Sequence, residues 1–75
     1  MEKLSELKSG TKCRVKEVSG SGPVKRRVLD MGVVPGSEIE VIRVAPLGDP
    51  MEFRLKGYYL SLRKEEAENV FVEVL

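Results

Sequence analysis

Glycine and proline interrupt this chain so often that only short elements fit between them. The sequence holds seven glycines and four prolines in 75 residues, and neither residue suits the interior of a strand or a helix. The segment Met51–Lys56 shows what lies between the interruptions, because Met51, Phe53 and Leu55 alternate with charged residues. A period of two places the apolar side chains on one face of a β-strand. The sequence therefore predicts a mainly β fold of short strands.

Four other segments have the character of strands. They are residues 11–19, 37–45, 58–62 and 70–75. In the first segment the alternation fails at Val18, which predicts either a β-bulge or a bend near Glu17. The second segment is apolar on both faces, as expected for a strand that is covered on both sides or bends between two layers. About five short strands would leave unpaired edges in an open sheet, so we expect partial closure into a small barrel.

One helix is predicted over residues 23–31, after the first strand. Pro23 suits the start of a helix, where its missing N–H costs nothing. Val28 and Met31 then lie on one apolar face, as in a helix that packs one side against a core. Gly32 follows and is placed to end the helix in the left-handed conformation.

A local conformation can be predicted for three other segments. Residues 63–68 predict a short helical turn before the last strand, with its glutamates solvated and partly paired with neighbouring cations. Residues 1–10 form either a helical turn or an extended lead-in. Pro35 and Gly36 stand in the order that a type II turn prefers, because the third residue of that turn needs a positive φ.

Composition narrows the classes of function. Thirteen Lys and Arg oppose twelve Asp and Glu, for a net charge of +1, whereas a dedicated nucleic-acid binder usually carries a larger basic excess. The absence of histidine removes the commonest general base and metal ligand. We therefore predict no enzyme, no metal site and no cofactor. Cys13 faces inward from the first strand and is expected to be a buried apolar residue, with redox sensing or thiol catalysis as the alternative.

The chain is expected to form one cytoplasmic domain over residues 1–75. A single cysteine excludes the internal disulfide that small secreted domains often need. The opening residues lack an apolar signal sequence, and no apolar run approaches the roughly 20 residues that span a bilayer. A domain of this size buries only about 60% of its unfolded surface, so we expect function to lie on the surface.

The basic run Lys25, Arg26 and Arg27 is one candidate for partner binding. These residues either contact an acidic partner or a phosphate, or they are the solvated face of the helix. Arg27 adjoins the apolar face and is expected to donate hydrogen bonds to loop carbonyls through its planar guanidinium.

The loop containing Leu47, Gly48 and Asp49 is the second candidate. Prolines on both sides stiffen it, and a stiff exposed loop that carries a leucine suits recognition. The alternative is a structural turn in which Asp49 accepts hydrogen bonds from nearby backbone N–H groups.

Several motifs occur together in one order along the chain. They are Leu4-x-x-Leu7-x-x-Gly10, Arg26-Arg27-Val-Leu-Asp-Met-Gly32, Pro35-Gly36, Ala45-Pro46-Leu47-Gly48-Asp49-Pro50 and Gly57-Tyr-Tyr-Leu60-Ser-Leu62-Arg63. In this order the chain resembles the FeoA family from end to end. The resemblance implies an SH3-like barrel with a helix inserted after the first strand. It also implies a small cytoplasmic accessory protein of bacterial ferrous-iron uptake.

The resemblance further implies a partner, the transporter FeoB with its cytoplasmic GTP-binding domain. Contact with a membrane would then come only through that partner, and no nucleic acid is expected. Unpaired edge strands allow a weak homo-oligomer. Two alternatives stay open. One is a nucleic-acid-binding small barrel, supported by the Lys25–Arg27 run. The other is an SH3-like domain related to the end of metal-dependent repressors such as the diphtheria toxin repressor.

Overall fold

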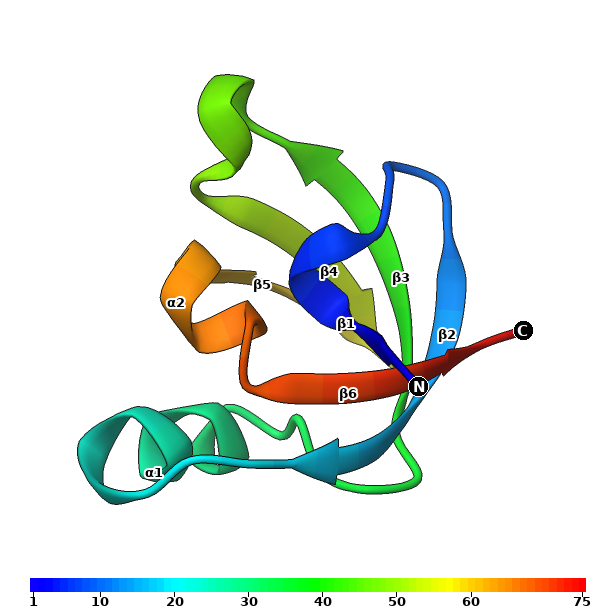
Figure 1. Ribbon diagram of the computed structural model, residues 1–75. Coiled ribbons are helices and arrows are strands. Elements are labelled where there is room, and N and C mark those ends of the chain that lie inside the picture. The colour runs from blue at the N-terminus through cyan, green and yellow to red at the C-terminus, as the bar shows by residue number, and fades with distance from the viewer.

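A six-stranded antiparallel sheet curls around one side of a shared core (Figure 1). The computed structural model describes all 75 residues. The strands are β1 (Glu2–Lys3), β2 (Lys12–Val18), β3 (Glu38–Val44), β4 (Met51–Leu55), β5 (Tyr58–Leu62) and β6 (Val70–Val74). Their order in the sheet is β1-β6-β2-β3-β4-β5. The first and last strands of the chain are therefore neighbours, and β1 and β5 are the two edges.

Two α-helices and two 3₁₀ turns complete the fold. They are η1 (Leu4–Glu6), α1 (Gly22–Asp30), η2 (Pro46–Gly48) and α2 (Lys64–Ala67). In Figure 1, α1 and η2 lie at opposite ends of one side of the molecule, and α2 lies between them. The five predicted strands, the helix near 23–31 and the turn near 63–68 are all confirmed. The sixth strand, β1, has only two residues, too few to show a period in the sequence.

Two bulges bend the sheet. The register between β2 and β6 shifts between Val15 and Glu17, which confirms a bulge, one of the two features predicted near Glu17. The register between β3 and β4 shifts between Val41 and Arg43. This second shift explains why β3 is apolar on both faces. Val41 is buried before the bulge, whereas Ile42 sits at the bend and is 37% exposed.

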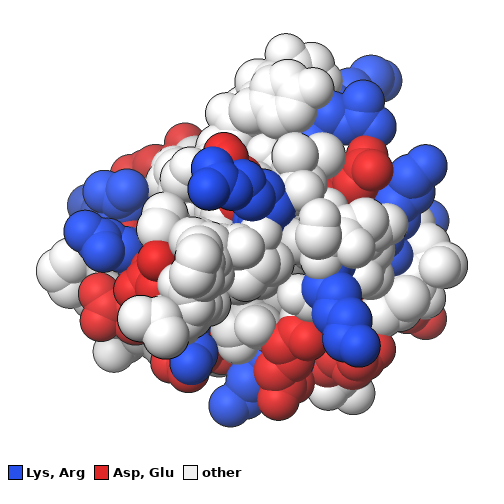
Figure 2. Space-filling view, turned by 90° about the horizontal axis from the view of Figure 1, so that it is seen from above, with Lys and Arg blue, Asp and Glu red and all other residues white.

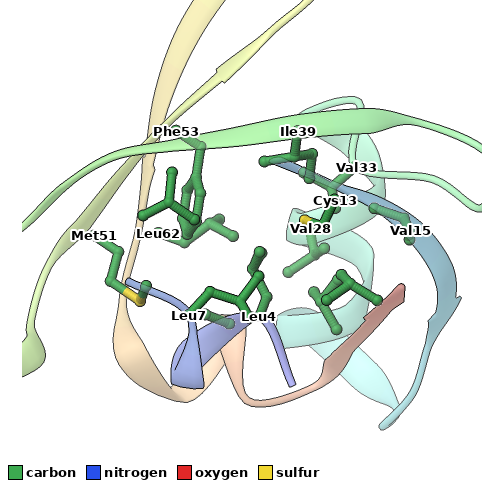
Figure 3. Close-up of a cluster of buried hydrophobic side chains, with 14 of the residues drawn as sticks. Leu4, Leu7, Cys13, Val15, Val28, Val33, Ile39, Met51, Phe53 and Leu62 are labelled. Carbon is green, nitrogen blue, oxygen red and sulfur yellow. The ribbon is translucent and has the colours of Figure 1, made fainter. Parts of the chain in front are cut away.

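The core draws side chains from every element except β1 and η2 (Figure 3). Its sixteen members are Leu4, Leu7, Cys13, Val15, Val18, Val28, Val33, Ile39, Val41, Met51, Phe53, Leu55, Leu62, Ala67, Val70 and Val72. Phe53, the largest fully buried side chain, comes from the strand with the clearest alternation. Leu4 and Leu7 are buried although they precede the main sheet. The opening segment therefore contributes to the core by a helical turn, as one of the two sequence expectations had it.

Tyr58 departs from its expected position. The alternation places it on one face with Leu60 and Leu62, but Tyr58 is 42% exposed while Leu62 is buried. Its hydroxyl donates a 2.8 Å hydrogen bond to the carbonyl of Met31 at the end of α1. Gly32 confirms the predicted left-handed helix end, with φ +97°. A β-carbon at Gly32 would also collide with the Tyr58 hydroxyl, so glycine is needed there for two reasons.

The turn between α1 and β3 follows the prediction. Gly36 has φ +95°, and the N–H of Ser37 donates to the carbonyl of Val34 at 3.0 Å. These are the features of a type II turn with Pro35 at its second position. The turn directs the chain from the end of α1 back into the sheet.

Candidate functional site

The two candidate segments lie on the same side of the molecule. We call this surface the helical side and define it as α1, α2 and the loop 45–50 that contains η2. Lys25, Arg26 and Arg27 lie on α1, and Leu47 and Gly48 lie in η2 with Asp49 directly after it. Helix α2 contacts α1 and is hydrogen-bonded to the loop. The sequence separates the segments by some twenty residues, and α2 connects them in space.

The junction between α1 and α2 is an ion pair of Arg27 with Glu66. The Arg27 Nε lies 2.7 Å from Glu66 Oε2, and the Glu66 side chain is only 7% exposed. Glu66 Oε1 also accepts a 2.8 Å hydrogen bond from the N–H of Arg63, which satisfies a free donor at the start of α2. Two expectations are corrected here. Arg27 pairs with a carboxylate, not with loop carbonyls, and Glu66 is buried, not solvated.

The junction between α2 and the loop is made by Asp49. Its Oδ1 accepts a 3.2 Å hydrogen bond from the N–H of Lys64, and its Oδ2 lies 4.0 Å from a guanidinium nitrogen of Arg63. Asp49 therefore bonds a backbone N–H, but not one close to it in the chain as turn chemistry predicts. That N–H lies fifteen positions further along the chain, in the first turn of α2. Two carboxylates, from Asp49 and Glu66, thus hold the N-terminus of α2.

Leu47 is the most exposed large apolar side chain of the protein. It is 98% exposed, and its φ of +73° makes it the one residue other than glycine with a positive φ. Its loop lies at the end of the molecule that faces the viewer in Figure 2, where positive and negative side chains are interspersed around uncharged surface. Sequence reasoning selected Leu47 from its flanking prolines, but nothing in the sequence indicated its backbone conformation.

The basic run on α1 divides into two parts. Arg27 is occupied by Glu66, whereas Lys25 and Arg26 form no ion pair. Arg26 is exposed and Lys25 is half-buried. The charge that is free to meet a partner therefore comes from Lys25 and Arg26. The pairing of Arg27 could not be predicted because Glu66 lies 39 positions away, on an element whose docking depends on the whole fold.

A groove of about 730 Å³ lies elsewhere, between the β4–β5 turn and the strands β2 and β3. Its lining includes Lys12, Glu38, Glu40, Lys56 and Tyr58. Charges of both signs share it, so it is not the basic track that a nucleic-acid backbone requires. No group of three or more Cys, Asp or Glu side chains is arranged to hold a metal ion anywhere in the structure. Sequence reasoning did not find the groove, because segments distant in the chain form its walls.

Comparison with known families decides the classification. The FeoA domain matches residues 2–74, nearly the whole chain. The chain belongs to the FeoA family. A curated relative from Porphyromonas gingivalis, the Fe(2+) transport protein A/Fe(2+) transporter FeoB fusion protein, is 41% identical over 97% of this chain. The chain spans only 9% of that fusion protein's length.

Solved structures of FeoA proteins share the fold. The FeoA-like protein of Clostridium acetobutylicum has a TM-score of 0.89 at 45% identity and covers 100% of this chain and 91% of its own. FeoA of Stenotrophomonas maltophilia, described as a prokaryotic SH3 domain protein complexed with zinc, has a TM-score of 0.83 at 28% identity. The match covers 97% of this chain and 91% of that one. The curled sheet described above is therefore the SH3-like fold that the resemblance implied.

The same fold occurs outside the FeoA family. A manganese-dependent transcriptional repressor matches 99% of this chain and 36% of its own length, with a TM-score of 0.90 at 18% identity. At that identity the likeness concerns the fold alone. Neither helix of the FeoA-family protein has the length and apolar character needed to cross a bilayer.

Proposed function

We propose that this protein is a cytoplasmic accessory protein of ferrous-iron uptake that acts by binding FeoB and has no catalytic activity of its own. The observation that carries the proposal is the relative in which Fe(2+) transport protein A and FeoB form one chain. Joining two proteins covalently keeps each at a high effective concentration near the other. Such an arrangement supports association between the corresponding separate proteins.

The helical side is the surface proposed to meet FeoB. Leu47 offers an exposed apolar group on a stiff loop, and Arg26 offers an unpaired positive charge on α1. The bonds from Asp49 and Arg27 to α2 fix these groups relative to each other, and a preorganised surface loses less entropy on binding. The partner surface that fits is an acidic one with a small apolar pocket. The cytoplasmic GTP-binding domain of FeoB is the proposed location of that surface.

Calorimetry with the cytoplasmic domain of the cognate FeoB tests this proposal. We expect Arg26→Glu and Leu47→Ser each to weaken binding at least tenfold, because a rim charge and an apolar anchor are lost. Lys8→Glu is the matched control for charge reversal, since Lys8 is exposed, forms no ion pair and lies outside the helical side as defined above. Titrations in GDP and in a non-hydrolysable GTP analogue cover the nucleotide states. No binding in either state would overturn the proposal.

A further inference from the structure

Strand β5 is an edge of the sheet and is unusual among the strands. It pairs with β4 on one side only. Its sequence, Tyr-Tyr-Leu-Ser-Leu, has no charged residue, whereas each of the other five strands carries at least one. Proteins usually protect an edge strand with charged residues, proline or a bulge, because an unprotected edge pairs with other chains. None of these devices occurs in β5.

The outer edge of β5 offers free backbone groups. The β4–β5 hairpin has a two-residue turn, with Leu55 opposite Tyr58 and Phe53 opposite Leu60. In such a hairpin the residues next to the turn exchange hydrogen bonds, and alternate residues do the same. The N–H and C=O groups of Tyr59 and Ser61 therefore point away from β4. Neither residue forms a backbone hydrogen bond to another loop or turn, and both side chains are exposed.

Positive charges stand at both ends of this edge. Lys56 precedes β5, and Arg63 and Lys64 follow it. Lys56 and Lys64 form no ion pair, and the guanidinium of Arg63 pairs only with Asp49, at 4.0 Å. Lys56 thus leaves a free positive charge before β5, and Lys64 leaves one after it, beside the Arg63–Asp49 pair. An uncharged strand between these two cationic ends is complementary to an apolar strand between two acidic ends.

We propose that the free edge of β5 binds an extended segment of a partner protein by strand addition, and that this segment is a short apolar run with acidic residues at both ends. Backbone bonds to Tyr59 and Ser61 supply the pairing, as in other cases of strand addition. The flanking cations select the acidic ends. The inference rests on the proposed protein-binding function and adds a second contact, which adjoins the helical side at Lys64, the first residue of α2.

A second copy of this chain fits the edge less well. Antiparallel pairing of two β5 strands centred on Leu60 would place Lys56 opposite Lys64 of the second copy. Like charges directly opposite each other destabilise strand pairing. The charges that favour an acidic segment therefore disfavour a homodimer through this edge.

Fluorescence anisotropy with two synthetic ten-residue peptides tests the proposal. Both peptides have a central run of alternating valine and threonine; one carries two glutamates at each end and the other carries two lysines. We expect the glutamate peptide to bind at least tenfold more tightly. Lys56→Glu should weaken its binding at least fivefold, while the matched charge reversal Lys8→Glu should leave it unchanged.

Amide hydrogen exchange locates the binding. We expect the N–H groups of Tyr59 and Ser61 to become at least tenfold more protected when the glutamate peptide is added. Ser61→Pro removes one outward N–H and should therefore weaken binding. The variant should still fold, because proline is tolerated on an edge strand when its nitrogen faces solvent. The exchange measurement on the unmodified chain needs no variant to fold.

Several outcomes would overturn the inference. They are equal binding of the two peptides, protection away from β5, and concentration-dependent protection of Tyr59 and Ser61 without peptide, which would identify a second copy as the occupant. The same exchange measurement on the complex with the FeoB cytoplasmic domain separates the two proposals. One further outcome is that the FeoB domain binds in a manner sensitive to Arg26→Glu while neither that domain nor the glutamate peptide slows amide exchange in β5. That result would refute strand addition and leave the proposed function standing.

Discussion

Neither the exposed side chain of Leu47 nor its backbone conformation stabilises the folded monomer. Its side chain is 98% exposed, so it gains no burial energy. Its φ of +73° costs a residue with a β-carbon about 1–2 kcal/mol. Glycine and asparagine adopt this conformation more easily. A costly leucine at an exposed position is the pattern expected when the side chain serves a binding surface.

Replacing Leu47 should separate stability from binding. We expect Leu47→Gly to raise the free energy of unfolding by about 0.5–1 kcal/mol, because the strain relieved exceeds the added entropy of the unfolded chain. Urea denaturation measures this change. Leu47→Ala keeps the β-carbon and should leave stability nearly unchanged. Both variants should bind the FeoB cytoplasmic domain more weakly, and a Leu47→Gly variant that loses stability would contradict the argument.

Cys13 behaves as an apolar core residue. It is fully buried on the inward face of β2, as its alternation with Val15 predicted. Burial raises the pKa of its thiol from 9.0 to about 11, and the nearby charge of Glu2 adds to the increase. A buried thiol with a raised pKa is a poor nucleophile. The alternative of redox sensing or thiol catalysis is therefore disfavoured on physical grounds.

The raised pKa also predicts how stability depends on pH. The thiol of the unfolded chain ionises near its ordinary pKa of 9.0, while the thiol of the folded protein stays protonated up to a pKa of about 11. Cys13 therefore makes its full contribution to stability below pH 9, and this contribution is lost as the pH rises toward 11. At pH 11 the loss of stability is roughly 2–3 kcal/mol. Urea denaturation of the wild type and of Cys13→Ala at pH 8 and pH 10.5 checks this. The difference between the two proteins should shrink at the higher pH, and a constant difference would refute the linkage.

At the scale of elements, α2 depends on its neighbours for its existence. It has four residues, far fewer than an isolated helix needs. Asp49 and Glu66 accept hydrogen bonds from its first N–H groups, and buried Ala67 anchors it in the core. The same contacts attach it to α1 and to the loop, so the element that joins the two halves of the helical side is also the one most dependent on tertiary contacts.

Removing the Glu66 carboxylate should loosen this connection. We expect Glu66→Ala to lower the free energy of unfolding by about 2 kcal/mol, because the bond to the Arg63 N–H and the pair with Arg27 are both lost. Thermal denaturation measures the loss. Glu65→Ala is the control, since the Glu65 side chain is exposed and forms none of these bonds; its effect should stay within about 0.5 kcal/mol. Equal effects from the two variants would show that the junction contributes nothing.

On the scale of the whole molecule, the sheet and core act as a support for surface contacts. The core is built from sixteen apolar residues. The helical side and the β5 edge adjoin each other at Lys64. The two proposed contacts would engage two segments of one partner, and a covalent link to that partner would reduce the affinity that each contact must supply.

Fusion to FeoB should rescue weak binding. We expect Arg26→Glu to reduce ferrous-iron transport when the two proteins are separate, and to have at most a small effect when a flexible linker joins this chain to FeoB. The reason is that the linker raises the effective concentration to the millimolar range. Iron uptake by cells that lack other ferrous transporters measures both cases. A variant that is equally impaired in the fused and separate forms would show that Arg26 does not act through affinity.

The sequence by itself determined the elements and most of the core. Alternation in β4 predicted Phe53 as buried, and a broken alternation predicted a bulge or bend near Glu17. Glycine and proline predicted the end of α1 at Gly32 and the type II turn at Gly36. These features follow from local rules, because strand period and backbone conformation are set by residues that are neighbours in the chain. The resemblance to the FeoA family likewise came from sequence motifs alone.

Only the tertiary structure decided which surfaces come together. The Arg27–Glu66 pair, the bond from Asp49 to Lys64 and the contact of Tyr58 with Met31 each join residues from different elements. The two-residue strand β1 and the free edge of β5 depend on strand order, which local periodicity does not encode. Long-range packing fixes these features, because it balances burial and hydrogen bonding over the whole chain at once.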